Sequence, residues 1–181
     1  MAHARHFPMK TRDEFGLLLK KLNLTGYGAE LGVATGSFSK TLLETSPLKI
    51  LFSIDRWNDH HNYQQYLKAA HLLSPFHERN IILKLPFEEA IHLFKNEAFD
   101  FIYIDGYAHT GQDEGRTLQQ WWPKVKPGGI FGGHDYSESW PKTIKEVDKF
   151  AACHPYCNLQ FTQEIVGQGG YPSWYCIKPS S

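Results

Sequence analysis

One short stretch constrains the fold more than any other part of this sequence. Residues 29–39 read Ala-Glu-Leu-Gly-Val-Ala-Thr-Gly-Ser-Phe-Ser: an apolar run with one acid, two glycines three residues apart, and then a helical pattern. Glycine lets a backbone take positive φ or approach a neighbour closely, and Thr35, Ser37 and Ser39 are each capable helix N-caps. The stretch therefore predicts a strand, a tight glycine loop and a helix.

The glycine spacing separates two kinds of ligand. Dinucleotide folds use G-x-G-x-x-G, whose glycines bring backbone amides to a pyrophosphate. Here the spacing is Gly32-x-x-x-Gly36, no third glycine follows, and Glu30 places an acid at the loop. An acid is unsuitable against a phosphate but suits a ligand with an ammonium group. The stretch thus resembles the first motif of class I S-adenosylmethionine-dependent methyltransferases, E/D-x-G-x-x-x-G, with a plain tight turn as the alternative.

Length and charge limit what else the chain can be. Its 181 residues suffice for one domain with a real core, and 19 Lys and Arg balance 19 Asp and Glu. Zero formal charge and the lack of a basic run argue against nucleic-acid binding. No apolar run approaches a membrane span, and the polar N-terminus lacks the apolar core of a signal peptide. We therefore expect a cytoplasmic protein with no membrane or nucleic-acid partner.

The cysteines fit the same expectation. Cys153, Cys157 and Cys176 are three in number, so at least one stays unpaired in any disulfide scheme. We read them as ordinary thiols in a reducing compartment, and not as zinc ligands, because only two further ligands stand at unconvincing spacing.

Strand and helix patterns alternate along most of the chain. Helices are expected after the glycine loop and at residues 11–22, 63–73, 87–94, 110–122 and 141–152. Strands are expected before the glycine loop and at 48–55, 81–85, 99–105, 130–133, 159–163 and 174–178. Such alternation predicts an α/β fold: a single-domain, doubly wound, mostly parallel seven-stranded sheet with helices on both faces. Residues 1–26 would form a lead-in helix and residues 27–181 the domain itself.

Acids recur where the predicted strands end. Glu30 lies on the first strand, and Asp55, Asp105 and Asp135 fall at or just past later strand ends. Ligands of parallel sheets bind beyond the carboxyl ends of the strands, and each acid would be costly to bury without a partner. Asp55, 19 residues after Gly36, is placed to accept both hydroxyls of a ribose. The sequence therefore predicts one acidic site at this edge.

The second half of the chain carries a more specific resemblance. The segments Phe-Ile-Tyr-Ile-Asp-Gly (101–106), Trp-Pro-Lys-Val-Lys-Pro-Gly-Gly (122–129) and Gly-Gly-His-Asp-Tyr (132–136) follow in that order. With the glycine loop, they resemble the small bacterial methyltransferases of the family 24 type, which are related to metal-dependent O-methyltransferases. The resemblance runs from about Tyr27 to Ile177. It implies the Rossmann-like methyltransferase fold and transfer of a methyl group from S-adenosylmethionine to a hydroxyl of a small molecule, assisted by a divalent cation, usually Mg²⁺.

The same resemblance assigns roles to single residues. The implied cofactor contacts are Glu30, Gly32, Gly36, Ser37, Asp55, Phe87 and Asp105, although Phe87 is equally suited to the core. Asp105 and Asp135 would end neighbouring strands and could share a hard cation through oxygen ligands. Such a cation would lower the pKa of the acceptor hydroxyl, which makes Asp105 a catalytic candidate.

Two departures from the family pattern affect the other candidates. Tyr136 stands where catechol-type enzymes carry Asn, so the third metal ligand would be His134 or water. Relatives tend to carry Asp-Gly-x-His after the fourth strand, whereas this chain has one residue more before His109. His109 is still the candidate general base, because its ordinary pKa lies near neutrality.

Other functions stay open at this point. A nicotinamide-dependent oxidoreductase would also have a strand, a glycine loop and an acid, but its motif requires a third glycine, which this chain lacks. A protein that binds S-adenosylmethionine without catalysis would use the first two strands equally well, so the pair Asp105 and Asp135 discriminates. Without a cap domain, the acceptor would be covered by loops, such as the His-rich segment 59–63, or by a second subunit of a homodimer. Trp121, Trp122 and Trp140 would then line the dimer face or belong to the core.

Overall fold

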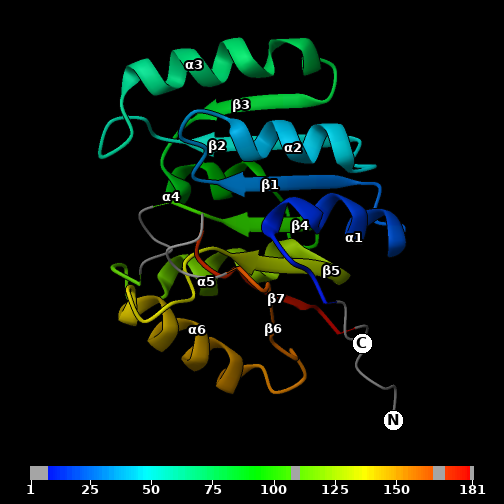
Figure 1. The fold of residues 1–181 in the computed structure, drawn as a ribbon, viewed down its shortest axis with the longest axis vertical. Coiled ribbons are helices and arrows are strands. Elements are labelled where there is room, and N and C mark those ends of the chain that lie inside the picture. Colours follow the sequence, from blue (N-terminus) through cyan, green and yellow to red (C-terminus); the bar gives the residue numbers. More distant parts are fainter. Residues whose placement is uncertain (1–7, 107–110, 165–169, 180–181) are drawn as a thin grey trace.

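The computed structural model describes residues 8–106, 111–164 and 170–179. Figure 1 labels the elements. The helices are η1 (Arg12–Glu14), α1 (Phe15–Lys21), α2 (Ser37–Thr45), α3 (Tyr63–Leu73), η2 (Ser74–Phe76), α4 (Phe87–Ala90), η3 (Ile91–Leu93), α5 (Arg116–Trp121), η5 (Trp122–Lys124) and α6 (Pro141–Cys153). The strands are β1 (Tyr27–Leu31), β2 (Ile50–Asp55), β3 (Asn80–Lys84), β4 (Phe99–Ile104), β5 (Val125–Gly133), β6 (Gln160–Phe161) and β7 (Trp174–Ile177).

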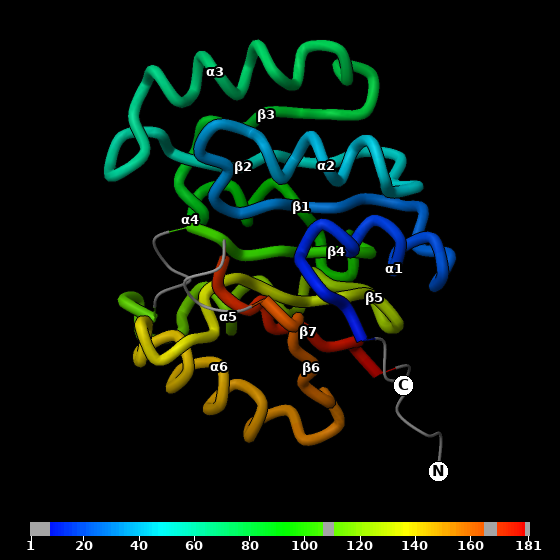
Figure 2. The backbone as a smooth tube through the Cα atoms, in the orientation of Figure 1, coloured from blue at the N-terminus to red at the C-terminus, as the bar shows by residue number. Residues whose placement is uncertain are grey.

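The seven strands form one sheet in the order β3-β2-β1-β4-β5-β7-β6. β1 to β5 pair in parallel, whereas β7 runs antiparallel to both of its neighbours. The tube in Figure 2 shows β1 to β4 running side by side, with their carboxyl ends at the left. The chain winds outward in both directions from β1 and β4, which creates a switch point beyond their carboxyl ends. The predicted mostly parallel, seven-stranded sheet is confirmed.

Each face of the sheet buries its own apolar core. On β4, Phe101 and Tyr103 belong to a cluster with α1 and α2, whereas Ile102 and Ile104 belong to a cluster with α4, α5 and α6. This follows from the two-residue period of a strand, which sends alternate side chains to opposite faces. Burying one such side chain completely stabilises the fold by about 1.5–3 kcal/mol. Helices therefore cover both faces, as predicted.

The lead-in helix packs directly on the sheet. The ring of Phe15, at the start of α1, lies 5.4 Å from the rings of Phe101, Tyr103 and Tyr175, measured between centroids. Phe15 is fully buried, as the helical spacing of the apolar residues in this segment predicts. One consequence matters for function: η1, just before α1, lies near the carboxyl end of β4.

The helix expected over residues 110–122 is much shorter in the structure. α5 begins only at Arg116, because Gly111, Glu114 and Gly115 all have positive φ, which an α-helix does not accommodate. The Asp113 side chain accepts hydrogen bonds from the amides of Gly115 and Thr117, which completes this turn. β5, in contrast, begins earlier than expected, at Val125, with a register shift against β4 before Ile130.

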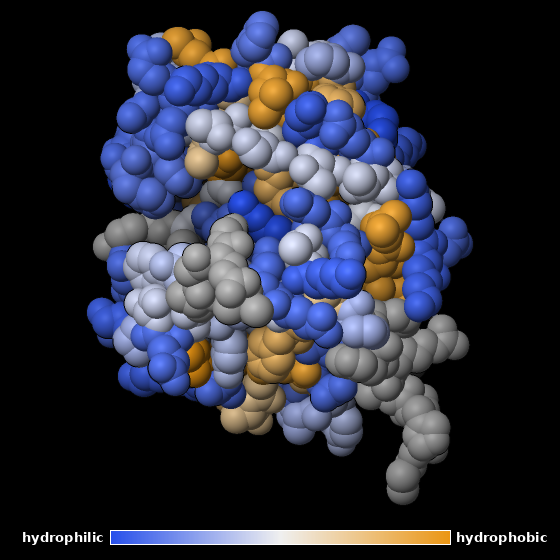
Figure 3. Space-filling view, viewed as in Figure 1, coloured by the Kyte–Doolittle hydropathy of each residue, from blue (hydrophilic) through white to orange (hydrophobic). Residues whose placement is uncertain are grey.

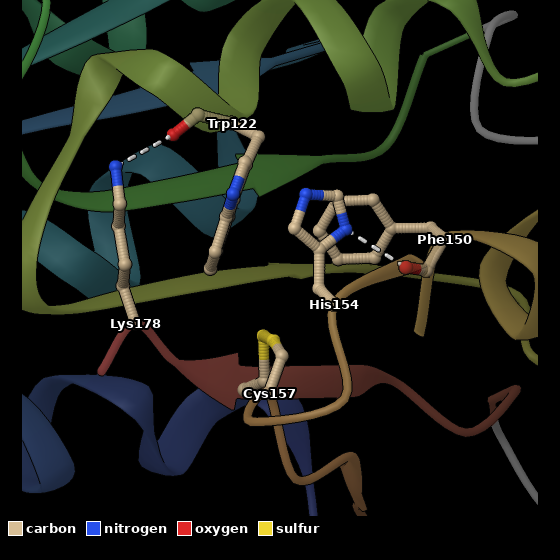
Figure 4. Close-up of a disulfide and its surroundings, with 6 residues drawn as sticks. Trp122, Phe150, His154, Cys157 and Lys178 are labelled. Carbon is tan, nitrogen blue, oxygen red and sulfur yellow. Dashed lines mark hydrogen bonds between the residues drawn. A yellow bond between two sulfur atoms is a disulfide. The ribbon is translucent and has the colours of Figure 1, made fainter. Parts of the chain in front are cut away.

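The expectation of three ordinary thiols is wrong for two of the cysteines. Cys157 and Cys176 form a disulfide, whereas Cys153 is free and exposed. Figure 4 shows the bond between the segment after α6 and β7, beneath the rings of Trp122 and His154. The two Cα atoms are 5.6 Å apart, a separation that a disulfide spans. The fold brings the two cysteines together, since they are separated by 19 positions in the chain.

Two more expectations concern the surface. Trp121 is fully buried, so it belongs to the core and cannot line a dimer face, while Trp122 and Trp140 are partly buried. Within the described ranges, no helix has both the length and the apolar character needed to cross a bilayer.

Candidate functional site

A cavity of about 230 Å³ opens beyond the carboxyl ends of the central strands. Gly32 after β1, Asp55 at the end of β2, Phe87 at the start of α4 and Gly106 after β4 all line it. Figure 3 shows this side of the molecule hollowed toward the same edge of the sheet, with hydrophilic residues gathered around the hollow. Three of the predicted cofactor residues, from three separate segments, thus meet in one cleft. Its other walls are Arg56, Asp59, His60, His61, Pro86, Glu88, Asp113, Arg116, Thr117 and Gln120.

The glycine loop is required for close contact between two backbones. Gly32 has φ +99°, and a Cβ built on it would lie 2.3 Å from the amide nitrogen of Gly106 and 2.4 Å from the carbonyl carbon of Asp105. A Cβ on Gly106 would in turn lie 2.5 Å from the ring of Phe87. The loops after β1 and β4 and the Phe87 ring therefore close the floor of the cleft together, and no side chain fits between them.

Gly36 has a related role at the start of α2. It is the N-cap residue with φ +85°, a left-handed conformation in which none of the predicted caps at Thr35, Ser37 or Ser39 is used. A Cβ at Gly36 would meet Ala69 of α3 at 3.2 Å, so the glycine also permits close helix packing. Ser37 is exposed, with its hydroxyl 3.4 Å from that of Thr35. Neither Gly36 nor Ser37 lines the described cavity.

Asp55 ties the loops of the cleft together. Its carboxylate accepts hydrogen bonds from the amides of Val33 (2.8 Å), Ala34 (3.0 Å) and Trp57 (2.9 Å), and it contacts Nδ1 of His61 at 2.7 Å. Burial alone would raise the pKa of Asp55, but these hydrogen bonds, that of His61 foremost, hold it below its ordinary value. Burial likewise opposes protonation of His61, yet the contact with Asp55 raises the pKa of the imidazole. The contact therefore favours an ionised carboxylate opposite a protonated imidazole.

Glu30 lies beneath the loop, in the sheet. Its carboxyl group is buried and accepts a hydrogen bond from the hydroxyl of Ser39, which lies 2.8 Å from the hydroxyl of Ser53. Burial raises the pKa of Glu30 to about 8, although the hydrogen bond from Ser39 opposes this shift. The acid is therefore mostly neutral at pH 7 and does not line the described cavity.

The acids after β4 and β5 are held by cations from the chain itself. The guanidinium of Arg12 lies 2.5 Å from Oδ2 of Asp105. Nδ1 of His134 lies 2.8 Å from Oδ1 of Asp135 and 3.4 Å from Oδ1 of Asp105. Burial would lower the pKa of His134, but hydrogen bonds to Asp105 and Asp135 raise it to about 9. Two carboxylates and two cationic groups thus form one compact cluster.

This cluster does not fit the predicted divalent cation. A metal ligand must offer a lone pair, and a histidine bound to metal is neutral, whereas Nδ1 of His134 faces carboxylate oxygens of Asp135 and Asp105, which favours the protonated ring. One oxygen of Asp105 is already paired with a guanidinium, whose positive charge would repel a metal ion. The three residues proposed from the sequence as metal ligands, Asp105, His134 and Asp135, therefore lie together, but as parts of ion pairs.

Two further candidates are the predicted base His109 and the polar segment 59–61. His109, the predicted general base, lies outside the described residues. Asp59, His60 and His61 each offer a ligand atom within 4.8 Å of the others, but exposed groups of this kind are common without an ion. His61 is already engaged with Asp55. The segment is therefore best described as a polar wall of the cleft, in line with its sequence.

Sequence reasoning missed Arg12 and the pairing of His61 with Asp55. Arg12 is separated from Asp105 by 93 positions, so no local pattern signals their contact. His61 stands in a visibly polar segment close to Asp55, and that proximity was the one available signal.

The fold and the cleft agree with comparisons to known proteins. The model of the methyltransferase domain family Methyltransf_24 matches residues 27–136, more than half of the chain. No curated protein matches the sequence significantly. Among solved structures, a proposed caffeoyl-CoA O-methyltransferase from Staphylococcus aureus is 18% identical with a TM-score of 0.68, over 97% of this chain and 86% of that one.

Two other solved structures are similar to the same degree. An O-methyltransferase from Bacillus cereus in complex with SAH is 17% identical with a TM-score of 0.69, over 98% of this chain and 84% of that one. An rRNA methylase from Streptococcus thermophilus is 13% identical with a TM-score of 0.67, over 95% and 99%. These likenesses establish the fold of class I S-adenosylmethionine-dependent methyltransferases. Because the family model matches residues 27–136, more than half of the chain, this chain belongs to the Methyltransf_24 family of methyltransferase domains.

Proposed function

We propose that this chain transfers the methyl group of S-adenosylmethionine to a hydroxyl oxygen of a small molecule. The observation that carries the proposal is the cleft itself, in which Gly32, Asp55 and Phe87 meet at the switch point of the sheet. The similar structures from Staphylococcus aureus and Bacillus cereus, both described as O-methyltransferases, support the choice of oxygen as acceptor atom.

Bound S-adenosylmethionine would supply the methyl group as an electrophilic sulfonium. Asp55, Pro86 and Phe87 line the cavity; the Asp55 carboxylate would accept hydrogen bonds from the ribose hydroxyls, and Phe87 with Pro86 would form the apolar wall for the adenine. Three of the hydrogen-bond donors to Asp55 are backbone amides of the loops. His61, the only side-chain donor among its described contacts, is therefore the group with which a ribose would compete.

A small acceptor fits the charge of the cleft better than a nucleic acid. Arg56 and Arg116 line the cavity together with Asp59, Glu88 and Asp113, so its rim carries both signs. Phosphate backbones are bound by clustered positive charge, and the formal net charge of this chain is zero. The similarity to an rRNA methylase therefore reflects the shared fold, because fold alone does not decide the acceptor.

Calorimetry with S-adenosylhomocysteine tests the donor half of the proposal. We expect a dissociation constant between micromolar and submillimolar, on the order of −5 to −8 kcal/mol. Asp55→Ala should weaken binding by about 1.5–3 kcal/mol, because charge-assisted hydrogen bonds are lost. Asp13→Ala, the same change at an exposed position outside the cleft, should leave affinity unchanged. Tight binding of NAD, together with no binding of S-adenosylhomocysteine, would contradict the proposal and favour an oxidoreductase.

The acceptor half needs a transfer assay. Purified protein with labelled S-adenosylmethionine and a panel of catechols, phenols and hydroxy acids should yield a methylated product detectable by mass spectrometry. Normal donor binding with no product from hydroxyl, amine or thiol acceptors would favour the second candidate, a protein that holds S-adenosylmethionine without catalysis. A cytoplasmic location stays a sequence-based proposal, against which the Cys157–Cys176 disulfide counts.

A further inference from the structure

Arg12 is fixed in place from several sides. Its guanidinium lies 2.5 Å from Oδ2 of Asp105 and 4.9 Å from the ring centroid of Phe38, over the face of α2. Its backbone amide donates to Oε1 of Glu164, 3.3 Å away. The arginine side chain is 28% exposed and that of Asp105 20%. Arg12 is therefore a positioned group beside Asp105, with one side open to solvent.

The position that Arg12 occupies matters because of the residue it contacts. Asp105 ends β4 next to the glycine loop, whose Gly32 packs against the backbone of Asp105 and Gly106. Nδ1 of His134 lies 3.4 Å from the other carboxylate oxygen, Oδ1. Each carboxylate oxygen of Asp105 thus faces a nitrogen donor of the chain itself. In a metal site, these oxygens would instead direct their lone pairs at the ion.

We propose that the guanidinium of Arg12 supplies the fixed positive charge of this site, so that Asp105 and Asp135 bind no divalent cation and methyl transfer is independent of metal. This inference rests on the proposed function for its catalytic part, whereas its metal-binding part stands on the contacts of Asp105 alone. A guanidinium has five N–H donors in a rigid fork. Those not used by Asp105 or by the hydroxyl of Tyr103 can donate to an acceptor oxygen, which a hydrated cation would otherwise hold.

Removing the guanidinium should therefore convert the site. Without Arg12, the carboxylates of Asp105 and Asp135 would both lie at the imidazole of His134, a donor set that suits Mn²⁺. Arg12→Met is the variant of choice, because a methionine side chain keeps an apolar contact with the ring of Phe38. Arg12→Ala serves as a second variant.

The experiment titrates Mn²⁺ alone into the full chain and measures bound ion by electron paramagnetic resonance. We expect no site in the wild type and at least about tenfold tighter Mn²⁺ binding in Arg12→Met. Arg12→Lys, which keeps the positive charge, should behave as the wild type. Lys40→Ala removes one positive charge from the exposed side of α2, where Lys40 pairs with Glu44, and should not create a site. The double variant Arg12→Met/Asp105→Asn should lose the gained site.

Two outcomes would overturn the inference. One is stoichiometric Mn²⁺ in the wild type that Asp105→Asn removes. The other is an Arg12→Met protein that keeps the circular dichroism spectrum and the urea unfolding midpoint of the wild type, and is therefore folded, yet gains no ion. Methyl transfer by the wild type should also be unchanged by EDTA. Because ion binding is measured without donor or acceptor, failure of the proposed function would leave this measurement interpretable.

Discussion

At the scale of single residues, the carboxyl edge of the sheet holds ionisable groups away from their ordinary charge states. Burial raises the pKa of Glu30 to about 8, and contacts with Asp105 and Asp135 raise that of His134 to about 9 in spite of burial. Both groups, and His61 as well, bind protons more tightly in the folded chain than in the unfolded one. The free energy of unfolding should therefore fall as pH rises from neutrality.

Glu30→Gln tests the largest of these effects. The wild-type carboxyl group is neutral in the fold below pH 8 but ionised in the unfolded chain above pH 4.5, so stability falls with rising pH across that interval. Glutamine keeps the shape of the neutral acid. Urea unfolding should show a small difference between variant and wild type at about pH 5, and a relative gain for the variant of about 1–3 kcal/mol at about pH 8.5. An equal difference at both pH values would show that Glu30 is ionised in the fold.

His61→Asn should show a pH dependence in the same direction, because His61 also binds its proton more tightly in the folded chain. A histidine with a raised folded pKa contributes stability that is complete below its ordinary pKa of 6.5 and is lost as pH rises through the folded value. The paired Asp55 contributes above pH 3.8 and loses that contribution as pH falls through its lowered folded pKa. The variant should therefore be less stable by about 1–2 kcal/mol near pH 5, and the difference should shrink above pH 7. His60→Asn, at an exposed position, should change little at either pH.

At the scale of elements, the site depends on loops that approach one another without side chains between them. Gly32 allows the loop after β1 to touch the loop after β4, and Gly106 allows the latter to touch the Phe87 ring of α4. A methyl group at Gly32 would therefore act on the loops first and on the ligand only through them.

Gly32→Ala and Gly128→Ala form a matched pair for this point. Both glycines have positive φ, +99° and +79°, but a Cβ at Gly128 would meet nothing within 4 Å. Gly128→Ala should cost only the backbone strain, about 1–2 kcal/mol. Gly32→Ala should cost more, because backbone atoms block its Cβ, and should also weaken binding of S-adenosylhomocysteine. Equal losses of unfolding free energy in the two variants would contradict the close packing of the two loops.

The disulfide links two elements that the sheet brings together late in the chain. It joins the segment after α6 to β7 across 19 positions, and closing such a loop is worth about 3 kcal/mol. Cys157→Ala should lower the unfolding free energy by about that amount, whereas Cys153→Ala, at the exposed free thiol, should not. Titration of the denatured, unreduced protein should find one thiol. Three thiols would mean that Cys157 and Cys176 are not bonded.

At the scale of the whole molecule, the homodimer remains a prediction, and one of the three tryptophans proposed for its interface no longer qualifies. Trp121 is fully buried. The four most exposed of the large apolar side chains described, Leu17, Tyr63, Leu93 and Tyr156, come from four different segments. Scattered apolar residues are normal on a monomer. Light scattering at several concentrations decides the question: a constant mass of one chain excludes the dimer, and twice that mass supports it. In the second case, Trp140→Ala compared with Leu17→Ala would test whether the partly buried tryptophan lies at the interface.

The local pattern of the sequence determined the architecture and the place of the site. The two-residue and 3.6-residue periods of apolar residues decide which segments are strands and helices, and α3 has the predicted bounds, Tyr63 to Leu73. Asp55 and Gly32 are recognisable because strand ends and glycine loops are local features. The predicted start of the helix at 110–122 was wrong for a local reason as well. Gly111 and Gly115 take left-handed conformations, which the spacing of apolar residues does not reveal.

Only the tertiary structure decided the charge states and the partners of the site. Glu30 is recognisable as an acid in the sequence, but its neutrality follows from burial, which outweighs the opposing hydrogen bond from Ser39. Asp105 and Asp135 are predictable as neighbours, yet whether they hold a metal ion or a guanidinium depends on Arg12, 93 positions away. The physical reason is that burial and Coulomb interaction act through space. Local sequence patterns carry information about backbone conformation, whereas these energies depend on which distant segments the fold places side by side.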